Sequence, residues 1–305
     1  MTTKQSPLIQ AVRSSDGVLH DLVAERREQV ETLQKRQAEQ LKETETRGQL
    51  QTKSLIEMLG KDYAELFRKL ETRHADAAKR TASYALEIRE RMEKSATTEA
   101  PLTAHPELAF GRLIAPAILI GIRPYYATLH GANGSVYWQG YNPGNFDLSD
   151  FASGSGPGWF GTGAGSFTVY LDWWFAFKPD ASRYYNYIVN VPFHGYYLIH
   201  ADDGFWDSKE AHARIDISAQ GYQYNWKARN STNVLDLDGQ NINDNDRFDG
   251  WRTTYYSDLL GGGDTAYLLV SSSFYVYARG GGSYAELNFS AGAANYIGVP
   301  YINVI

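Results

Sequence analysis

The 305-residue sequence contains no cysteine, which excludes disulfides, thiol catalysis and thiolate metal sites. A long apolar run is also missing: the most apolar stretch, 113–122, contains Pro116 and is too short to span a bilayer as a helix. Residues 1–17 include no apolar core of the kind that a signal peptide needs. We therefore expect synthesis as a soluble cytoplasmic protein, with any release by a non-classical route.

Common catalytic motifs are absent as well. The sequence has no GxSxG, HExxH or GxxxxGK[ST], and its carboxylates show no spacing that selects an acid–base pair. The glycine-rich segment 154–165 precedes a predicted strand, whereas a phosphate-binding loop needs a helix N-terminus there. With a formal net charge of −6, the chain is not expected to bind nucleic acid. We expect no enzyme activity, and keep an enzyme on a jelly-roll scaffold as an alternative.

Proline is absent from residues 16–94, which contain only Gly17, Gly48 and Gly60 as glycines. The segment is rich in the residues that lose least on entering a helix. Its apolar residues recur with a period of about 3.5, which is typical of a coiled-coil seam: Leu55, Leu59, Leu66, Leu70, Ala77, Tyr84, Ile88 and Met92. A helical stalk over 16–95 that forms a homo-oligomer is therefore predicted.

The first half of this helical segment has a weaker seam, because Gln37, Thr44 and Gly48 fall at positions that favour apolar side chains. One alternative is a helical hairpin that folds back between Gly48 and Gly60. We favour a parallel bundle of several chains, because 49–59 lacks the Pro, Asn or Asp of a tight turn.

The composition changes near residue 100, since all seven tryptophans and 25 of the 28 glycines lie beyond it. The hydrophobic period changes to two, as in 167–177, where every odd position is large and apolar. After Gly221 the phase of the alternation flips, which predicts a β-bulge. We predict an α+β multidomain chain: a flexible arm (1–15), the stalk (16–95), a linker (96–107) and an antiparallel, jelly-roll-like β-sandwich head (108–305).

Three segments are predicted to be loops of the head: 141–166, 201–209 and 236–250. Trp159 and Trp206 lie in the first two, and Asp202 and Asp203 add hydrogen-bond acceptors. With Tyr184 they form the predicted ligand-binding set, because exposed aromatic rings on a polar surface suit stacking on sugars. The predicted function is recognition of a surface ligand, with a glycan as the candidate. The alternative from another class is a toxin-like protein whose helical half meets a membrane.

The third loop suggests a cation. Asp236, Asp238 and Asp244 offer oxygen ligands at alternating positions, as calcium requires, although the EF-hand glycine and glutamate are missing. Asx residues also form turns without metal. We therefore expect no required cofactor, and calcium at Asp236, Asp238 and Asp244 is the one alternative that the sequence leaves open.

Overall fold

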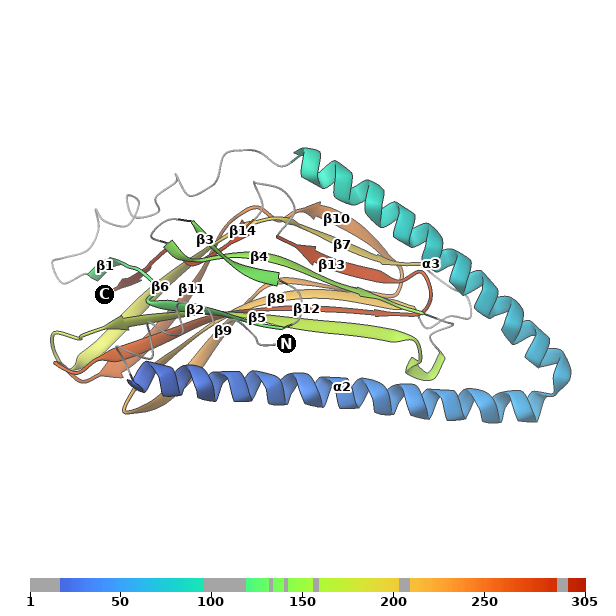
Figure 1. Cartoon of the computed structure of the whole chain (residues 1–305), viewed down its shortest axis with the longest axis horizontal. Helices are drawn as coiled ribbons and strands as arrows, with labels where there is room; N and C mark the ends of the chain where they lie inside the picture. Colours follow the sequence, from blue (N-terminus) through green and yellow to red (C-terminus); the bar gives the residue numbers. More distant parts are fainter. Residues whose placement is uncertain are drawn as a thin grey trace, which may run out of the picture.

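The computed structural model describes residues 17–95, 119–131, 134–139, 142–155, 159–202, 209–289 and 296–305. The predicted arm (1–15) and linker (96–107) lie outside these residues. Two helices precede two antiparallel β-sheets that face each other (Figure 1). Neither helix is apolar enough, over a sufficient length, to cross a membrane within the described part of the chain.

The helical segment bends sharply at Gly60. Helix α2 (Gly17–Leu59) ends there and α3 (Lys61–Ser95) begins, with Gly60 at a φ of +82°, a conformation that glycine adopts without strain. In Figure 1 the two helices diverge from this bend and lie along opposite sides of the sandwich. The chain thus turns at the end of the range that the hairpin alternative names, but each helix packs on the sandwich and not on the other helix as in a hairpin. A coiled coil is not shown by the described residues.

The larger sheet has ten strands and the smaller has five. The smaller sheet has the order β2-β5-β12-β8-β9, formed by β2 (Tyr126–His130), β5 (Ala164–Phe177), β12 (Ala266–Arg279), β8 (Glu210–Gln223) and β9 (Asn225–Gly239). The larger sheet has the order β1-β15-β6-β14-β4-β13-β7-β10, with β11 beside β6 and β3 beside β4. Its strands are β1 (Leu119–Ile122), β3 (Gly134–Gln139), β4 (Asn142–Ser153), β6 (Arg183–His194), β7 (Tyr196–Ala201), β10 (Ile242–Arg247), β11 (Gly250–Leu260), β13 (Tyr284–Asn288), β14 (Tyr296–Ile297) and β15 (Ile302–Val304).

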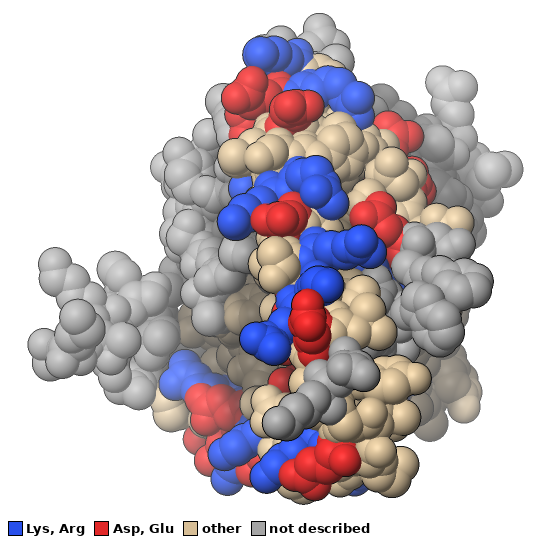
Figure 2. All heavy atoms as spheres, turned by 90° about the vertical axis from the view of Figure 1, so that its right-hand side faces the viewer, with Lys and Arg blue, Asp and Glu red and all other residues tan. Residues whose placement is uncertain are grey.

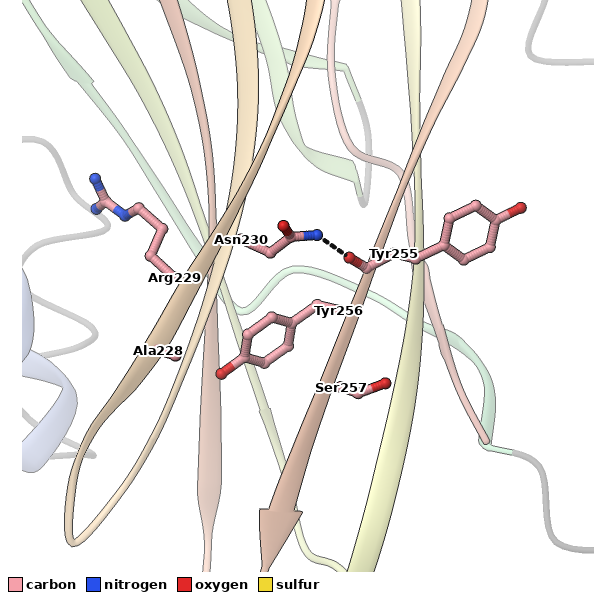
Figure 3. Close-up of a pocket in the computed structure, with 6 residues that line it drawn as sticks. All are labelled: Ala228, Arg229, Asn230, Tyr255, Tyr256 and Ser257. Atoms are coloured by element: carbon pink, nitrogen blue, oxygen red, sulfur yellow. Dashed lines mark hydrogen bonds between the residues drawn. The ribbon is translucent and has the colours of Figure 1, made fainter.

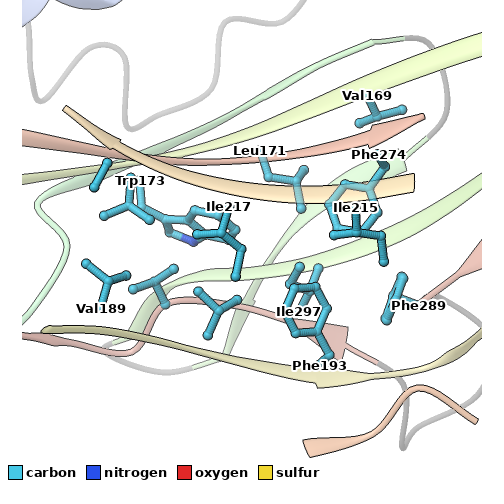
Figure 4. Packing of buried hydrophobic residues seen from close by; sticks show 14 of the residues in the cluster. Val169, Leu171, Trp173, Val189, Phe193, Ile215, Ile217, Phe274, Phe289 and Ile297 are labelled. Atoms are coloured by element: carbon cyan, nitrogen blue, oxygen red, sulfur yellow. The ribbon is translucent and has the colours of Figure 1, made fainter. Parts of the chain in front are cut away.

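The core lies between the two sheets, as the period-two alternation predicts. Val169, Leu171 and Trp173 of β5 are fully buried and face residues of the larger sheet such as Phe193 (Figure 4). The register of β8 against β9 shifts between Gln220 and Tyr222, which confirms the bulge predicted at Gly221. The antiparallel sandwich is therefore confirmed.

Two of the predicted loops contain strands. Strand β4 occupies much of 141–166, and β10, with the end of β9, occupies much of 236–250. Both segments are rich in Asn and Asp, which favour turns by local preference. Pairing overrides this preference, since β4 lies between β3 and β13, and β10 pairs with β7.

Part of the apolar face of each helix is buried against the sandwich of the same chain, whereas Leu59 and Leu66 near the bend stay exposed. Leu19, Leu22 and Val23 of α2 pack with a cluster that includes Trp174 and Tyr267. On the other side, α3 contributes Ala85, Ile88 and Met92 to a cluster with Tyr196, Leu198 and Tyr284. The argument that this seam needs a second chain is therefore wrong for these residues. Self-association itself stays a prediction.

The polar seam positions contact the sandwich as well. The hydroxyl of Thr168 donates to Gln37 Oε1 at 3.2 Å. A Cβ on Gly48 would come within 2.4 Å of Thr162 Cγ2 and 2.9 Å of the Phe160 carbonyl oxygen. Gln37 therefore bonds the sheet directly, and the missing side chain of Gly48 lets α2 come close to the segment from Phe160 to Thr162.

A buried ion pair joins α2 to the smaller sheet. Arg26 donates through Nε to Asp172 Oδ2 at 3.0 Å and through a second nitrogen to Ser271 Oγ at 3.1 Å. His130 Nε2 lies 3.2 Å from the same Asp172 oxygen. Burial alone would raise the pKa of Asp172, but the hydrogen bond from His130 and the charge of Arg26 outweigh it and lower that pKa to about 2. Asp172 is therefore ionised at neutral pH despite its complete burial.

A second buried pair joins α3 to the larger sheet. Arg89 Nε lies 2.9 Å from Oε2 of the fully buried Glu286. The same carboxylate accepts hydrogen bonds from Tyr284 Oη at 2.8 Å and from Asn288 Nδ2 at 3.0 Å. Each helix thus places one arginine on one buried carboxylate of the sandwich.

The low pKa of Asp172 predicts a loss of stability in acid. A carboxyl whose pKa is lower in the folded than in the unfolded chain stabilises the fold above the unfolded pKa, near 3.9. This contribution, about 2 kcal/mol, should disappear as the pH falls from about 4 toward 2. Urea unfolding at pH 4, 3 and 2 should give a steeper decline for the natural chain than for Asp172→Asn. Equal slopes would contradict the assignment.

Candidate functional site

Strands β6 and β11 carry a set of exposed side chains on one face. Their antiparallel register places Tyr184 opposite Leu259, Asn186 opposite Ser257 and Ile188 opposite Tyr255. Directly opposite residues point to the same face of a sheet. The intervening residues of the two strands point inward, and Tyr185, Tyr187 and Tyr256 are buried in the core.

We call the set Tyr184, Asn186, Tyr255, Ser257 and Leu259 the tyrosine face. The exposed fraction is 69% for Tyr184, 58% for Tyr255 and 51% for Leu259. The Ser257 hydroxyl donates a hydrogen bond to Asn186 Oδ1, between the two tyrosines. Tyr255 pairs across the strands with Ile188, which follows Tyr184 by four residues. At about 3.3 Å per residue, the backbone positions of the two tyrosines are therefore about 13 Å apart along the strands.

A groove of about 350 Å³ opens beside this face, between β9 and β11 (Figure 3). It is lined by Ala228, Arg229, Asn230, Tyr255, Tyr256 and Ser257. Figure 3 shows Tyr255 and Ser257 on one side of β11 and Tyr256 on the side toward β9. The groove therefore shares Tyr255 and Ser257 with the tyrosine face.

Hydrogen bonds hold this part of the sandwich in place. Asn230 Nδ2 donates to the carbonyl oxygen of Tyr255, and the hydroxyls of Thr232 and Thr254 lie 2.7 Å apart, so β9 is tied to β11. On the other side of β6, Asn186 exchanges backbone hydrogen bonds of 2.8 and 2.9 Å with Ile305. The face is thus built on paired strands, which favours a fixed geometry for a ligand.

The phenol at the base of the groove is neutral at physiological pH. Burial raises the pKa of Tyr256, and the hydrogen bond that its Oη donates to Asp258 Oδ2, at 3.0 Å, adds to this effect. Tyr256 Oη in turn accepts a hydrogen bond from the backbone N–H of Gly221 at 3.0 Å. Tyr256 therefore supports the groove and is unsuited to act as a base.

The described residues that line the groove offer rings, an amide and hydroxyls, and no carboxylate, whereas the guanidinium of Arg229 points away from them (Figure 3). Such groups can stack on an apolar ring face and exchange hydrogen bonds with hydroxyls. A pair of carboxylates of the kind used for glycoside hydrolysis is not assembled by these residues. The arrangement suits binding of a polyhydroxylated ligand.

The predicted ligand-binding residues are not brought together. Tyr184 belongs to the tyrosine face, whereas Asp202 follows β7 and pairs with His200 at 3.0 Å. Trp159 begins a short 3₁₀ turn, Trp159–Gly161. Asp203 and Trp206 lie outside the described residues. Tyr255 was missed because it is followed by a second tyrosine, and the sequence alone does not show which ring faces outward.

The three residues predicted to bind calcium lie on strands. Asp236 and Asp238 are in β9 and Asp244 is in β10. Asp236 accepts from His212 Nε2 at 2.7 Å, and Asp244 accepts from the Tyr197 hydroxyl at 3.3 Å. Within the described part of the chain, no three His, Cys, Asp or Glu side chains are grouped to hold a metal ion. The structure therefore does not assemble the predicted site, and calcium binding stays an untested prediction.

No protein-family model and no curated protein matches the sequence. Among solved structures, the chain is similar to TmCBM61 in complex with β-1,4-galactotriose, with 10% identity and a TM-score of 0.23 over 58% of this chain and 86% of that one. A family 16 carbohydrate binding module is 12% identical, with a TM-score of 0.16 over 54% and 78%. Tailspike protein 4 of bacteriophage CBA120 is 9% identical, with a TM-score of 0.17 over 57% and 18%. Because these TM-scores are low, the function has to be argued from the site alone.

Proposed function

We propose that this chain is a non-enzymatic sugar-binding protein that holds an oligosaccharide along the tyrosine face. The observation that supports it is the pair Tyr184 and Tyr255, both more than half exposed on one face of paired strands. Asn186 and Ser257 lie between them and offer hydrogen-bonding groups. Two aromatic platforms separated by polar groups match the alternation of apolar ring faces and hydroxyls along a sugar chain.

The spacing favours a chain of sugars over a single ring. Two platforms that arise about 13 Å apart lie too far from each other to contact one ring, so a ligand that uses both must extend along β6 and β11. In the groove, the amide of Asn230 provides a further polar group next to Tyr255 (Figure 3). A linear oligosaccharide can follow this direction.

Self-association remains a further proposal for the helical segment, now centred on the bend. Several large apolar side chains are exposed around it: Leu50, Met58, Leu59, Tyr63 and Leu66. Charges of both signs alternate on the side of the molecule that includes this bend (Figure 2). A second copy could therefore meet both the apolar side chains and complementary charges. The toxin-like alternative would first require both helices to leave the sandwich.

Removing both rings should abolish strong binding. In Tyr184→Ala with Tyr255→Ala, each lost stacking contact should cost about 1 kcal/mol, so affinity should fall on the order of 30-fold. A glycan array selects the ligand, and calorimetry with that oligosaccharide measures the change. Tyr224→Ala is the matched control, because Tyr224 is 70% exposed but lies at the turn between β8 and β9.

Circular dichroism and thermal melting establish whether the double variant keeps its fold. A folded double variant that binds as the natural chain does would overturn the assignment of the face. Equal losses in the double variant and in Tyr224→Ala would also contradict it, because the effect would then not be specific to this face.

A further inference from the structure

A second cavity lies where α3 passes over the ends of β7 and β10. Its volume is about 310 Å³, and its polar lining consists of Arg80, Thr81 and Tyr84 from α3, His200 and Asp202 from β7 and the residue after it, and Asn243 from β10. Only Gly195 separates β6 from β7, and His200 lies 14 residues further along the chain than Asn186 of the tyrosine face, so the two sites lie toward opposite ends of these consecutive strands. The cavity is therefore separate from the tyrosine face.

One wall of this cavity presents a cation. Arg80 is exposed on α3, and it has no carboxylate partner within the part of the chain that the structure describes. Two other basic residues of the same helix are paired: Lys79 lies 3.7 Å from Asp76, and Arg89 lies 2.9 Å from Glu286. Arg80 is thus available to a carboxylate from outside, which a guanidinium can bind through two parallel hydrogen bonds.

The opposite wall presents an oriented acceptor. Asp202 Oδ1 lies 3.0 Å from His200 Nε2, and its Oδ2 lies 4.0 Å from Lys209 Nζ. The side chain of Asp202 is still about half exposed, at 51%. A carboxylate held in this way can accept hydrogen bonds from hydroxyl groups of a ligand.

Between the two walls lie an aromatic ring and an amide. The ring of Tyr84 packs against His200 with a centroid distance of 5.9 Å. The Tyr84 hydroxyl donates to Asn243 Oδ1 at 3.3 Å. This bond orients the Asn243 amide, so that the NH₂ group of Asn243 can donate to a ligand. The cavity therefore combines one cation, one acceptor, one amide donor and one ring.

We propose that this cavity binds an acidic sugar unit, with its carboxylate on Arg80 and its hydroxyls on Asp202 and Asn243. A simple anion such as phosphate would use Arg80, but it lacks the ring hydroxyls whose hydrogen bonds to Asp202 offset the repulsion between the two negative charges in an acidic sugar. A neutral sugar would use Asp202 and Asn243 but leave the guanidinium without an anion. This site is independent of the tyrosine face, and neither proposal depends on the other.

Occupation of the cavity would tie the helix to the sandwich. Arg80 and Tyr84 come from α3, whereas Asp202 and Asn243 come from the β-sandwich. A ligand that binds only when these walls are together stabilises that arrangement by mass action. Hydrogen exchange at residues 77–84 should therefore slow when the ligand is bound.

The test is calorimetry on the full chain with glucuronate, and with glucose and inorganic phosphate as matched probes. Glucuronate should bind more tightly than either of them. Arg80→Gln should weaken glucuronate binding at least about tenfold, because it removes a charge-assisted pair. Asp202→Asn should weaken it as well. Arg73→Gln is the control, since Arg73 is also exposed on α3 and does not line the cavity.

Three results would overturn the proposal. These are no binding of glucuronate at millimolar concentration, unchanged affinity in Arg80→Gln, and phosphate binding as tight as that of glucuronate. The last would show a simple anion site. Slowed exchange at 77–84 in the natural chain but not in Arg80→Gln would support the proposed bridging.

Discussion

Replacing Arg26 with methionine is expected to lower the free energy of unfolding by about 3 kcal/mol, because an unpaired charge in a protein interior is strongly unfavourable. Asp172 is fully buried and would keep His130, whose Nε2 lies 3.2 Å from its Oδ2, and the charge of Arg229 as neighbours. Methionine retains most of the aliphatic packing over Tyr170, whose ring lies 5.4 Å from the guanidinium. Urea unfolding measures the loss, and hydrogen exchange over 17–59 shows whether α2 opens first.

A double-mutant cycle separates the pair from its surroundings. Arg26→Met with Asp172→Leu removes both charges and should recover most of the lost stability, since apolar replacements of a buried pair are often neutral or stabilising. Arg27→Met is the matched control, because Arg27 is the next residue and is exposed. A loss in Arg27→Met equal to that in Arg26→Met would show that the buried pair does not hold α2 in place.

Deleting residues 1–95 is expected to make the remaining β-sandwich self-associate. The deletion uncovers two clusters that the helices bury, one around Trp174 and Tyr267 and one around Tyr196 and Leu198. Exposed apolar surface of this kind promotes association. Sedimentation should give a mass above that of a monomer, and a hydrophobic dye should bind more strongly than to the full chain.

This expectation reverses what the sequence alone suggests, namely that self-association depends on the helical stalk. The full chain, sedimented at the same molar concentration, is the control and also tests whether the helices associate between chains. A monodisperse, monomeric fragment that binds no dye would contradict this expectation, because the two uncovered clusters would then not promote association. In that case the helices would not be needed to keep the sandwich soluble.

Much of the fold could be predicted from local patterns. The alternation in 167–177 and the phase change at Gly221 predicted a strand and a bulge, because both depend on neighbouring residues only. The partner of the helices could not be predicted in this way. A period of about 3.5 shows that a helix has an apolar face, but not whether another helix or a sheet covers it.

The sequence nevertheless contained an indication that the outer face of the smaller sheet is covered. Asp172 lies between Tyr170 and Trp174 on the outer face of β5, and two large aromatic rings on an outer face indicate that something covers it. The candidate site was predicted only through Tyr184. Its neighbour Tyr255 depends on the register of β6 against β11, which no local pattern specifies.

The contacts of Arg26 also affect how the chain folds during synthesis. Ser271, one of its two partners, follows 245 residues later in the sequence, and Glu286 follows Arg89 by 197 residues. At roughly 5–20 residues per second, Arg26 waits on the order of 10–50 s for Ser271 to be made. During this interval both helices expose their apolar faces before any sheet exists to cover them. We therefore expect the growing chain to be prone to association through its amphipathic helices until the sandwich is complete.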